Sequence, residues 1–573
     1  MAHVEIDQER GDIVITSEWR ERELCKAVPG ARWDNDARRW RMPLSWAACI
    51  AARGVFGPGL AVGPLLAEWS RVEYDGRVAP ALALREARDI QPIDPYPAKL
   101  YPFQRAGAAF LTAASSALLA DEMGLGKTAQ TIVALGALHA WPTLVVCPNS
   151  VKRTWVSELL TWAPGVEAVV VGGGAAARKK QIAAFCTLLD EGRDAVLIVN
   201  WEALRLHSRL SGYGSIRLSD DEKTDRELNL IGWASVIADE AHRAKQPQAK
   251  QTRALWAVGK NARHRFALTG TPIANSPEDL WAIMRFVSPD EWPSKTRFID
   301  RYCILSWNAF GGMDVTGLRS ETRGELFRFL DPRFIRRPKS AVLTELPEKT
   351  YVRRHVELTP KQRKSYDDLR DHLLTMLDEG ALVASHPLQR LTRLIQFASA
   401  HATLDEGGNL SLAEPSATLD DLELVVEEMG GRAVVIAAES RQLIELAALR
   451  LQKSGVSHGL ITGAVAPADR QVTIDRFQAG DLQVVLLTMG AGGEGITLTA
   501  ADTIVFLQRS FSSVKNVQTE DRIHRIGQRE AVTVIDIVAV DTVQERVLDV
   551  MLQKGARLEE VARDAETLRT WLV

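Results

Sequence analysis

The chain has 573 residues, of which 46% are hydrophobic and 25% are charged, and its 40 glycines and 24 prolines exclude a collagen-like or wholly disordered protein. A chain of this length is expected to contain roughly three to four domains with sizeable cores. Because 70 Lys and Arg stand against 73 Asp and Glu, the net charge of −3 excludes a uniformly basic nucleic-acid coat. Any site for a polyanion is therefore expected to be a local patch or cleft.

The cysteines and the amino-terminal residues indicate in which cellular compartment the protein is expected. The 5 cysteines are scattered, without a CxxC pair or a Cys/His cluster at zinc spacing, so neither a disulfide framework nor a zinc finger is expected. The start of the chain carries acids where a signal peptide needs basic residues, and no apolar run approaches the ~18 residues of a membrane span. We expect a soluble, cytoplasmic protein without a membrane partner, associated with the nucleoid or, if encoded by a phage, acting in the host cytoplasm.

Residues 1–75 are expected to form a separate accessory domain of α+β type. VEIDQERGDIVIT alternates as a β-hairpin does, and PGARWDNDARRWRMPLSW combines turns, aromatic residues and four arginines. Trp33, Trp40 and Trp46 could simply form the core of such a domain. A linker is expected over residues 76–94.

From about residue 95 the sequence repeats a short apolar run, a loop rich in Gly, Pro, Asn or Asp, and a segment with helical periodicity. This pattern is typical of parallel α/β layers. The first series of apolar runs lies at residues 117–120, 144–147, 195–199, 235–238 and 265–268, and the second at 433–437, 458–461, 484–487, 503–507 and 533–538. Two series predict two doubly wound parallel-sheet lobes, over residues 95–329 and 416–573.

Two stretches depart from this pattern. Residues 330–415 have few buried-strand signals and several long polar helical patterns, so we expect a helical connector and linker there. Residues 205–228 interrupt the first series with a charge-dense stretch that lacks a clear period. An exposed, mobile insertion is expected at that point.

The strongest chemical signal is LLADEMGLGKTAQTIVAL, an apolar strand followed by a Gly-containing loop and the start of a helix. Gly124 and Gly126 would let backbone amides approach a polyphosphate. Lys127 would reach the outer phosphates, and the Thr128 hydroxyl would bind Mg²⁺. Asp121 stands where the general pattern GxxxxGK[ST] has glycine. A Gly-rich turn without a ligand is the alternative for the loop taken alone.

In ASVIADEAHRAK, an apolar strand ends in two adjacent carboxylates, Asp239 and Glu240. Acids at the carboxyl end of a buried parallel strand face the nucleotide crevice. We expect Asp239 to hold the Mg²⁺ shell and Glu240 to orient and deprotonate the attacking water. An acidic helix N-cap is the alternative, disfavoured by the phosphate loop earlier in the same layered unit.

QTEDRIHRIGQ places Arg522 and Arg525 three residues apart, on one face if the segment is helical. Arginines supplied by the second lobe could stabilise charge on the transferring phosphoryl group and couple hydrolysis to lobe closure. Surface arginines that pair with Glu520 and Asp521 are the alternative.

Together these motifs resemble those of the Swi/Snf-type DNA translocases of helicase superfamily two. The likeness runs from about residue 100 to residue 550 and includes LYPFQRAGAAFL, DEMGLGKT, DEAH, LTGTPIANSPEDLW, LLTMGAGGEGITLTAAD and QTEDRIHRIGQ. The connector block FIRRPKSAVLTELPEKT separates this family from ordinary RNA helicases. The resemblance implies two RecA-like lobes and a DNA-dependent ATPase that hydrolyses ATP to ADP and phosphate with Mg²⁺.

The resemblance also implies roles for individual residues. Gln104 would read the adenine edge, and Thr269 and Thr271 would link the nucleotide to the nucleic-acid track. The remaining nucleotide contacts would be Asp121, Glu122, Met123, Gly124, Leu125, Gly126, Lys127, Thr128, Gly495, Arg522 and Arg525, with Asp239 and Glu240 completing the catalytic set and Thr128 and Asp239 as metal ligands. A sequence-independent grip on DNA phosphates is expected from Ser150, Lys152 and Asn200 in the first lobe and from Arg470, Thr488 and Gly490 in the second.

Within the family, the segment from RYC to LPEK, residues 301–349, is similar to the annealing-helicase, fork-remodelling subgroup. PGARWDNDARRWRMPLSW vaguely resembles that subgroup's HARP module, which binds branched or single-stranded DNA. No histone-reading extension is visible, which disfavours a nucleosome remodeller.

The expected function is an ATP-dependent DNA translocase on duplex, forked or single-stranded DNA, in DNA repair, replication or recombination. A strand-separating DNA or RNA helicase, a non-catalytic DNA-binding recruitment protein, and the motor subunit of a restriction or phage replication assembly are the alternatives.

Overall fold

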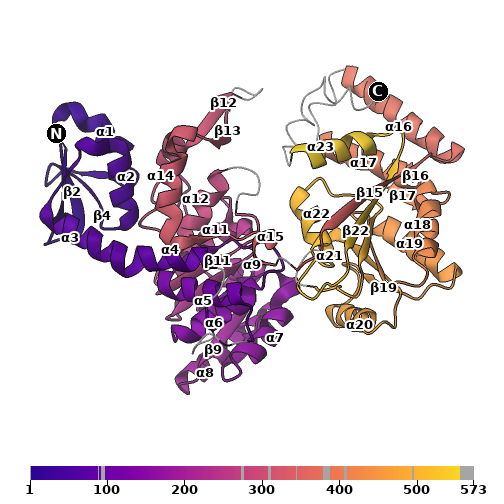
Figure 1. Ribbon diagram of the computed structural model, residues 1–573, viewed down its shortest axis with the longest axis horizontal. Helices are drawn as coiled ribbons and strands as arrows, with labels where there is room; N and C mark the ends of the chain where they lie inside the picture. Colours follow the sequence, from indigo (N-terminus) through magenta and orange to yellow (C-terminus); the bar gives the residue numbers. More distant parts are fainter. Residues whose placement is uncertain are drawn as a thin grey trace. The chain divides into compact units, whose positions relative to one another are not determined.

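The computed structural model describes residues 2–87, 90–91, 97, 99–272, 277–307, 312–343, 345–378, 387–404, 410–492 and 496–554. The chain forms two compact units, Met1–Val342 and Leu343–Val573 (Figure 1). The first unit contains a small α+β domain and an α/β lobe, and the second contains another α/β lobe. The expected fold class, two doubly wound parallel-sheet lobes with a small amino-terminal α+β domain, is confirmed.

The amino-terminal domain is built on a five-stranded sheet in the order β3-β4-β2-β1-β5. Trp40 is buried and packs edge-on against the half-exposed Trp33, with ring centroids 5.5 Å apart, so at least Trp40 belongs to the core. The elements are β1 (His3–Asp7), β2 (Asp12–Thr16), α1 (Arg22–Ala27), β3 (Arg32–Asp34), β4 (Arg39–Pro43), α2 (Trp46–Phe56), β5 (Ala61–Val62), α3 (Pro64–Glu73) and α4 (Ala79–Glu86).

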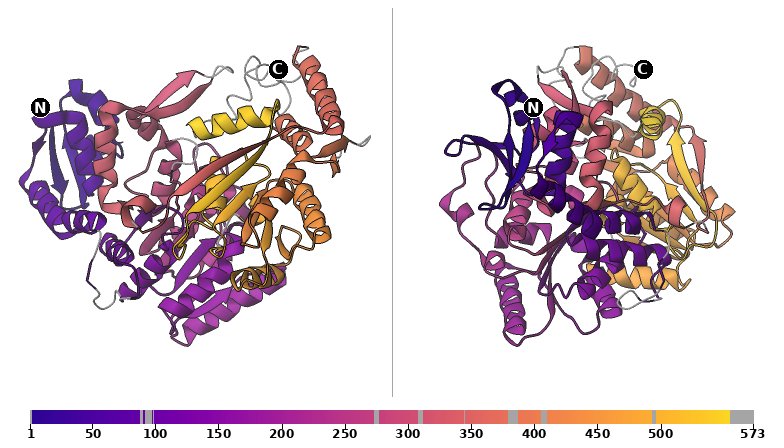
Figure 2. Two further views of the ribbon diagram at one scale, coloured as in Figure 1. Left: turned by 45° about the vertical axis from the view of Figure 1, so that its right-hand side comes forward. Right: turned by 60° about the vertical axis from the view of Figure 1, so that its left-hand side comes forward.

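This domain packs against the lobe that follows it in the first unit (Figures 1 and 2). Helix α2 contacts α14 (Ser320–Leu330), and the Arg297 guanidinium donates to the Val28 carbonyl at 3.3 Å. The linker expected over residues 76–94 is not a simple linker, because α4 occupies much of it and packs on α5 (Pro102–Ala114). Ala81 of α4 is buried in the lobe's core, which explains the apolar character of this stretch.

The first lobe has a seven-stranded, wholly parallel sheet in the order β14-β6-β11-β10-β7-β9-β8. Its strands are β6 (Ala117–Leu119), β7 (Thr143–Cys147), β8 (Glu167–Val170), β9 (Ala195–Asn200), β10 (Ser235–Asp239), β11 (His264–Leu268) and β14 (Phe334–Ile335). Its helices, besides α5 and α14, are α6 (Lys127–Ala137), α7 (Lys152–Trp162), α8 (Ala175–Asp190), α9 (Trp201–His207), α10 (Asp220–Lys223), α11 (Lys250–Gly259), α12 (Glu278–Val287), α13 (Lys295–Tyr302) and α15 (Lys339–Val342). A two-stranded hairpin, β12 (Cys303–Trp307) and β13 (Met313–Leu318), lies between α13 and α14.

Alternate residues of the central strands enter two different cores. In β10, Val236 and Ala238 pack in the core that contains α8, α9 and α11–α14, whereas Ile237 packs in the core that contains α4–α7. Burial on both faces requires a continuous apolar run, and all five runs expected in this lobe are strands.

The second unit has a six-stranded parallel sheet in the order β15-β22-β21-β18-β20-β19. Its strands are β15 (Lys349–Val356), β18 (Val434–Ala438), β19 (His458–Ile461), β20 (Val484–Thr488), β21 (Thr503–Phe506) and β22 (Val532–Ala539), and β16 (His401–Leu404) pairs with β17 (Leu410–Ala413) in a separate sheet. Its helices are α16 (Pro360–Asp378), α17 (Pro387–Ser399), α18 (Ala417–Glu428), α19 (Arg441–Lys453), α20 (Pro467–Gln478), α21 (Met489–Gly492), α22 (Ser513–Glu520) and α23 (Val543–Lys554). None of the helices in the described part of the chain is long and apolar enough to cross a membrane.

The prediction of a helical connector over residues 330–415 is only partly correct, because this stretch contains strands as well as helices. β14 extends the first sheet beside β6, and β15 pairs along its whole length with β22 in the second sheet. Tyr366 of α16 and Leu394 of α17 are buried in the second unit's core. β15 escaped notice because it is an edge strand with several exposed residues and no apolar run.

The exposed insertion expected over residues 205–228 also needs correction. The stretch starts inside α9, and both Leu210 and Leu228 are buried in the first lobe's core. Its charges form local pairs, such as Arg226 with Asp221 at 2.6 Å. The dense charge therefore marks a solvent-facing surface over a packed segment.

A buried network of charges ties β15 to the rest of the second unit. Arg509 donates to both carboxylate oxygens of Asp536, at 2.6 and 2.9 Å, and to Glu520 at 2.6 Å. Lys349 of β15 donates to Glu520 at 3.0 Å and to Asp521 at 3.1 Å. Burial opposes the charge of Glu520, but the Lys349 ammonium and the Arg509 guanidinium outweigh it and lower its pKa.

We expect Arg509→Ala to destabilise the second unit by about 3–5 kcal/mol, because it leaves the buried Asp536 carboxylate without its hydrogen-bonded cation and removes one of the two cations beside Glu520. Urea unfolding followed by circular dichroism measures the change. Arg432→Ala is the matched control: the Arg432 side chain is 57% exposed and pairs with Asp502 at 3.3 Å, so its loss should cost no more than about 1 kcal/mol. Equal effects of the two substitutions would contradict the prediction.

Candidate nucleotide site

The predicted nucleotide residues of the first unit gather at one edge of its sheet. β6, β11 and β10 are neighbouring parallel strands, so their carboxyl ends lie side by side. The phosphate loop follows β6, Thr269 follows β11, and Asp239 ends β10. Residues more than 100 positions apart in the sequence therefore meet on one surface.

The loop between β6 and α6 has the backbone that a phosphate cradle needs. Gly124 has a φ of 83° and Gly126 a φ of 71°, values in the left-handed region that favours glycine. A Cβ on Gly126 would also collide with the Gln104 carboxamide, 2.3 Å away. Both glycines are thus required by the loop's shape, and α6 begins directly after it at Lys127, with Thr128 in its first turn.

Lys127 lies across this loop. Its ammonium donates to the Asp121 carbonyl at 2.8 Å and to the Glu122 carbonyl at 3.3 Å. A cation held at the mouth of a loop of backbone amides is the arrangement that binds polyphosphate. Glu122, Met123, Gly124 and Gly126 are half-buried around it, whereas Leu125 is buried.

Two tryptophans hold Asp239 in place. The Trp155 indole donates to the Asp239 carboxylate at 2.9 Å, and the Trp201 indole donates to its backbone carbonyl at 3.2 Å. Burial and the neighbouring Glu240 carboxylate raise the pKa of Asp239 to about 7. Neither tryptophan was predicted to be part of the site, although Trp155 lies three residues after Lys152, a predicted DNA contact.

Glu240 adopts a strained backbone with a φ of 51° and a ψ of 51°, which costs a residue with a Cβ about 1 kcal/mol or more. The His242 Nδ1 lies 3.2 Å from the Glu240 carboxylate and 3.2 Å from the Thr269 hydroxyl. The Thr269 hydroxyl in turn accepts from the Thr271 amide at 3.1 Å. A chain of polar contacts thus runs from the expected base to both threonines.

Two predicted nucleotide contacts, Gln104 and Asp121, make side-chain hydrogen bonds to the protein at the phosphate loop. The Gln104 carboxamide accepts from the Tyr101 amide at 3.0 Å and donates to the Leu125 carbonyl at 3.2 Å, so it supports the loop. The Asp121 side chain is fully buried and bonded to Arg337, so its carboxylate is not a nucleotide contact. Arg337 itself was not predicted, because it lies 216 positions away in the sequence.

In the second unit, Arg522 and Arg525 converge on one point. The helix α22 ends at Glu520, so the two arginines lie in turns and not on one helix face as expected. Their guanidiniums nevertheless both donate to the Ile496 carbonyl, at 3.3 and 3.4 Å. The two carboxylates of the alternative pairing have other cations beside them, since Lys349 pairs with Glu520 and Asp521 and Arg509 pairs with Glu520. Gly495 lies outside the described residues.

Of the predicted DNA contacts in the first unit, Lys152 needs correction. Its ammonium is buried and donates to the Val171 carbonyl at 2.6 Å and to the Asn200 side chain at 3.0 Å. Burial lowers the pKa of Lys152. Lys152 therefore positions Asn200 at the end of β9, while Ser150 is exposed after β7.

The second unit's predicted DNA contacts lie on three elements. Arg470 in α20 donates to the Val465 carbonyl at 2.8 Å and remains half-buried. Thr488 ends β20 and is buried, and Gly490 in α21 is exposed with open space where a Cβ would be. Thr488 and Gly490 are thus neighbours at the carboxyl edge of the second sheet.

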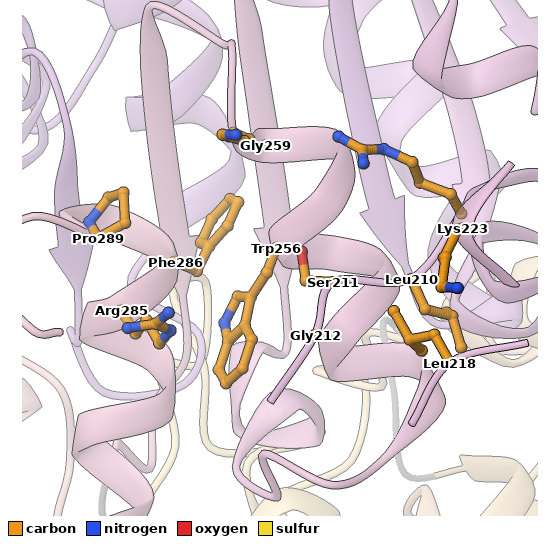
Figure 3. Close-up of a pocket in the computed structure, with 12 residues that line it drawn as sticks. Leu210, Ser211, Gly212, Leu218, Lys223, Trp256, Gly259, Arg285, Phe286 and Pro289 are labelled. Carbon is orange, nitrogen blue, oxygen red and sulfur yellow. The ribbon is translucent and has the colours of Figure 1, made fainter. Parts of the chain in front are cut away.

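A separate cavity of about 380 Å³ lies at the end of α11, next to the amino end of β11 (Figure 3). Arg285 lies over the rings of Trp256 and Trp281 there, 5.2 and 5.4 Å from their centroids. None of the predicted site residues lines this cavity.

We expect Glu240→Gln to bind ATP but to lose most of its turnover, at least about 100-fold, because the amide cannot accept a proton from water. Steady-state phosphate release and equilibrium binding of a fluorescent ATP analogue measure the two effects separately. Lys127→Ala is the contrasting variant, in which nucleotide binding itself should be lost. Turnover of Glu240→Gln within about twofold of the wild-type rate would contradict the role of Glu240.

Two protein-family models match this chain. The model of the SNF2-related domain matches residues 46–401, more than half of the chain, and that of the helicase conserved C-terminal domain matches residues 416–527. A solved structure, described as the Sulfolobus solfataricus SWI2/SNF2 ATPase core in complex with dsDNA, is 24% identical with a TM-score of 0.38 and covers 84% of this chain and 97% of its own.

Curated relatives are similar over most of this chain. Mouse chromodomain-helicase-DNA-binding protein 1-like is 31% identical over 446 residues, 75% of this chain and 46% of that protein. The Saccharomyces cerevisiae ISWI chromatin-remodeling complex ATPase ISW1 is 30% identical over 487 residues, 81% of this chain and 40% of that protein. The chain thus spans less than half the length of these two relatives. With the matched domains and the nucleotide-site geometry together, the chain belongs to the SNF2-related family of helicase-like ATPases.

Proposed function

We propose that this ATPase is a DNA translocase whose activity is stimulated by duplex or branched DNA. The contact chain from Glu240 through His242 to Thr269 carries the proposal. It connects the expected catalytic base to the loop after β11, so a change at the nucleotide alters the loops at the same sheet edge where Ser150 and Asn200 lie. Such a connection is what converts hydrolysis into movement on a track.

The nucleotide is proposed to bind to the loop amides and to Lys127. The residues fit Mg²⁺, because the Thr128 hydroxyl and the half-buried Asp239 carboxylate are hard oxygen ligands, and a nearby cation would counter the rise in the pKa of Asp239. Bound there, Mg²⁺ would neutralise charge on the phosphates. Glu240 would orient and deprotonate the attacking water, and Arg522 and Arg525 would stabilise the transferring phosphoryl group.

DNA is proposed to bind through its phosphates, independently of sequence. Ser150 and Asn200 in the first unit, and Arg470, Thr488 and Gly490 in the second, offer hydroxyl, amide, guanidinium and backbone groups for that purpose. Lys152 would act through Asn200, which it holds at 3.0 Å.

The process is proposed to be DNA repair, replication or recombination, with the chain in the annealing-helicase subgroup and acting in the cytoplasm or nucleoid. The amino-terminal domain, proposed as residues 1–75, would add a HARP-like contact to branched or single-stranded DNA. The exposed Arg32, Arg38 and Arg39 beside the half-exposed Trp33 support a nucleic-acid surface on its β3–β4 hairpin.

The relatives' names favour a second candidate, an ATPase that moves proteins along DNA. Both curated relatives described above carry names of chromatin proteins. Displacement of a DNA-bound protein in an ATP-dependent assay would distinguish this role from fork remodelling on bare DNA.

The proposal is tested by the ATPase rate without nucleic acid and with single-stranded DNA, duplex DNA, forked DNA and RNA at one fixed salt concentration. We expect strong stimulation by duplex or forked DNA and little by RNA. Equal or greater stimulation by RNA would overturn the DNA translocase and favour a strand-separating RNA helicase. An absence of stimulation by every nucleic acid would also overturn it.

We further expect Arg525→Ala to bind ATP normally and to hydrolyse it about 10³-fold more slowly, because an arginine finger acts only on charge that develops in the transition state. Nucleotide binding and single-turnover hydrolysis separate the two effects. Weakened binding with intact turnover of the bound ATP would assign Arg525 to ground-state binding instead.

A further inference from the structure

The phosphate loop rests on a buried ion pair whose two members lie far apart in the sequence. Asp121 has no exposed surface and Arg337 is 6% exposed. Arg337 Nε donates to Asp121 Oδ1 at 3.0 Å, Arg337 Nη2 donates to Asp121 Oδ2 at 2.5 Å, and the Arg337 backbone amide donates to Oδ1 at 3.1 Å. The guanidinium and the carboxylate thus meet in a two-pronged contact, which fixes their relative orientation.

Three further groups complete the surroundings of Arg337. Its Nη2 also donates to the Gln130 side chain at 2.7 Å, and its Nη1 donates to the Phe103 carbonyl. The Phe103 ring centroid lies 5.4 Å from the guanidinium carbon. Gly107 of α5 leaves the space for this arrangement, because a Cβ there would collide with both Gln130 and Arg337.

Backbone contacts align the segment that carries Arg337 with the start of the loop. The Ala120 amide donates to the Ile335 carbonyl at 2.7 Å, and the Glu122 amide donates to the Arg337 carbonyl at 3.1 Å. The Lys339 amide donates to the Glu122 carboxylate at 2.7 Å. Residues 335–339 therefore run beside the first residues of the loop, as a continuation of the pairing between β14 and β6.

We propose that Arg337 is a positioning residue for nucleotide binding, which acts through Asp121. At the position where the general phosphate-loop pattern has glycine, Asp121 supplies the carboxylate that accepts hydrogen bonds from Arg337. Gln130 joins the pair to the loop, since it donates to Asp121 at 3.2 Å and to the Leu125 carbonyl at 3.1 Å. The loop is then held in its binding shape only while residues 335–339, the last part of the first unit, are docked.

The test separates this role from a purely structural one. Arg337→Ala leaves a buried carboxylate without its cation, so it should lower both the melting temperature and the affinity for ADP with Mg²⁺, the latter at least about tenfold. The double variant Asp121→Ala with Arg337→Ala removes both charges. It should recover most of the melting temperature but not the ADP affinity, because the ion pair that holds the phosphate loop in its binding shape is still missing.

Arg336→Ala is the matched control, since Arg336 is exposed and adjacent to Arg337 in the sequence. The ADP affinity of this variant should stay within about twofold of wild type.

If Arg337→Ala does not fold, Arg337→Lys and Asp121→Asn keep the side-chain volume. Each should weaken ADP binding at least about threefold, because neither can form the two-pronged contact. Recovery of ADP affinity together with stability in the double variant would overturn the proposal. So would unchanged ADP affinity in every folded variant. None of these readouts depends on DNA.

Discussion

Burying a carboxylate completely costs free energy unless a cation and hydrogen bonds compensate for the lost water. Asp121 meets this constraint through Arg337 and Gln130, and the phosphate loop is built around the result. Gly107 has to be glycine to make room for these side chains. A motif that looks local in the sequence thus depends on residues from α5, α6 and the strand β14.

The parallel sheet supplies the second requirement of the site. Neighbouring parallel strands deliver their carboxyl ends to one edge, and β6, β11 and β10 bring the loop, Thr269 and Asp239 together there. At this edge the protein accepts strain and unfavourable charge, in the left-handed backbone of Glu240 and the raised pKa of Asp239. Such features cluster where a site must respond to its ligand.

The sequence predicted the central strands well because each is buried on both faces and needs an unbroken apolar run. It missed β15, an edge strand of mostly exposed residues, and it took the packed segment after α9 for an exposed insertion. Motif spacing singled out Lys127, Asp239 and Glu240, which the structure brings to one edge of the first sheet. It could not show that Lys152 is buried against Asn200 or that Arg337 pairs with Asp121, because these contacts join distant segments through side-chain packing.

The structure explains two of the basic residues in the block FIRRPKSAVLTELPEKT. Arg337 near its start pairs with Asp121 of the phosphate loop, and Lys349 near its end pairs with Glu520 and Asp521 beside Arg522. Each pair lies inside its own unit, and each joins a strand or its continuation to a motif that the sequence predicts to take part in nucleotide chemistry. Buried ion pairs add little net stability compared with apolar packing, but they penalise every arrangement in which the partners separate. One short stretch of chain therefore holds a predicted ATPase motif in each unit through a buried ion pair, which accounts for basic residues at these two positions.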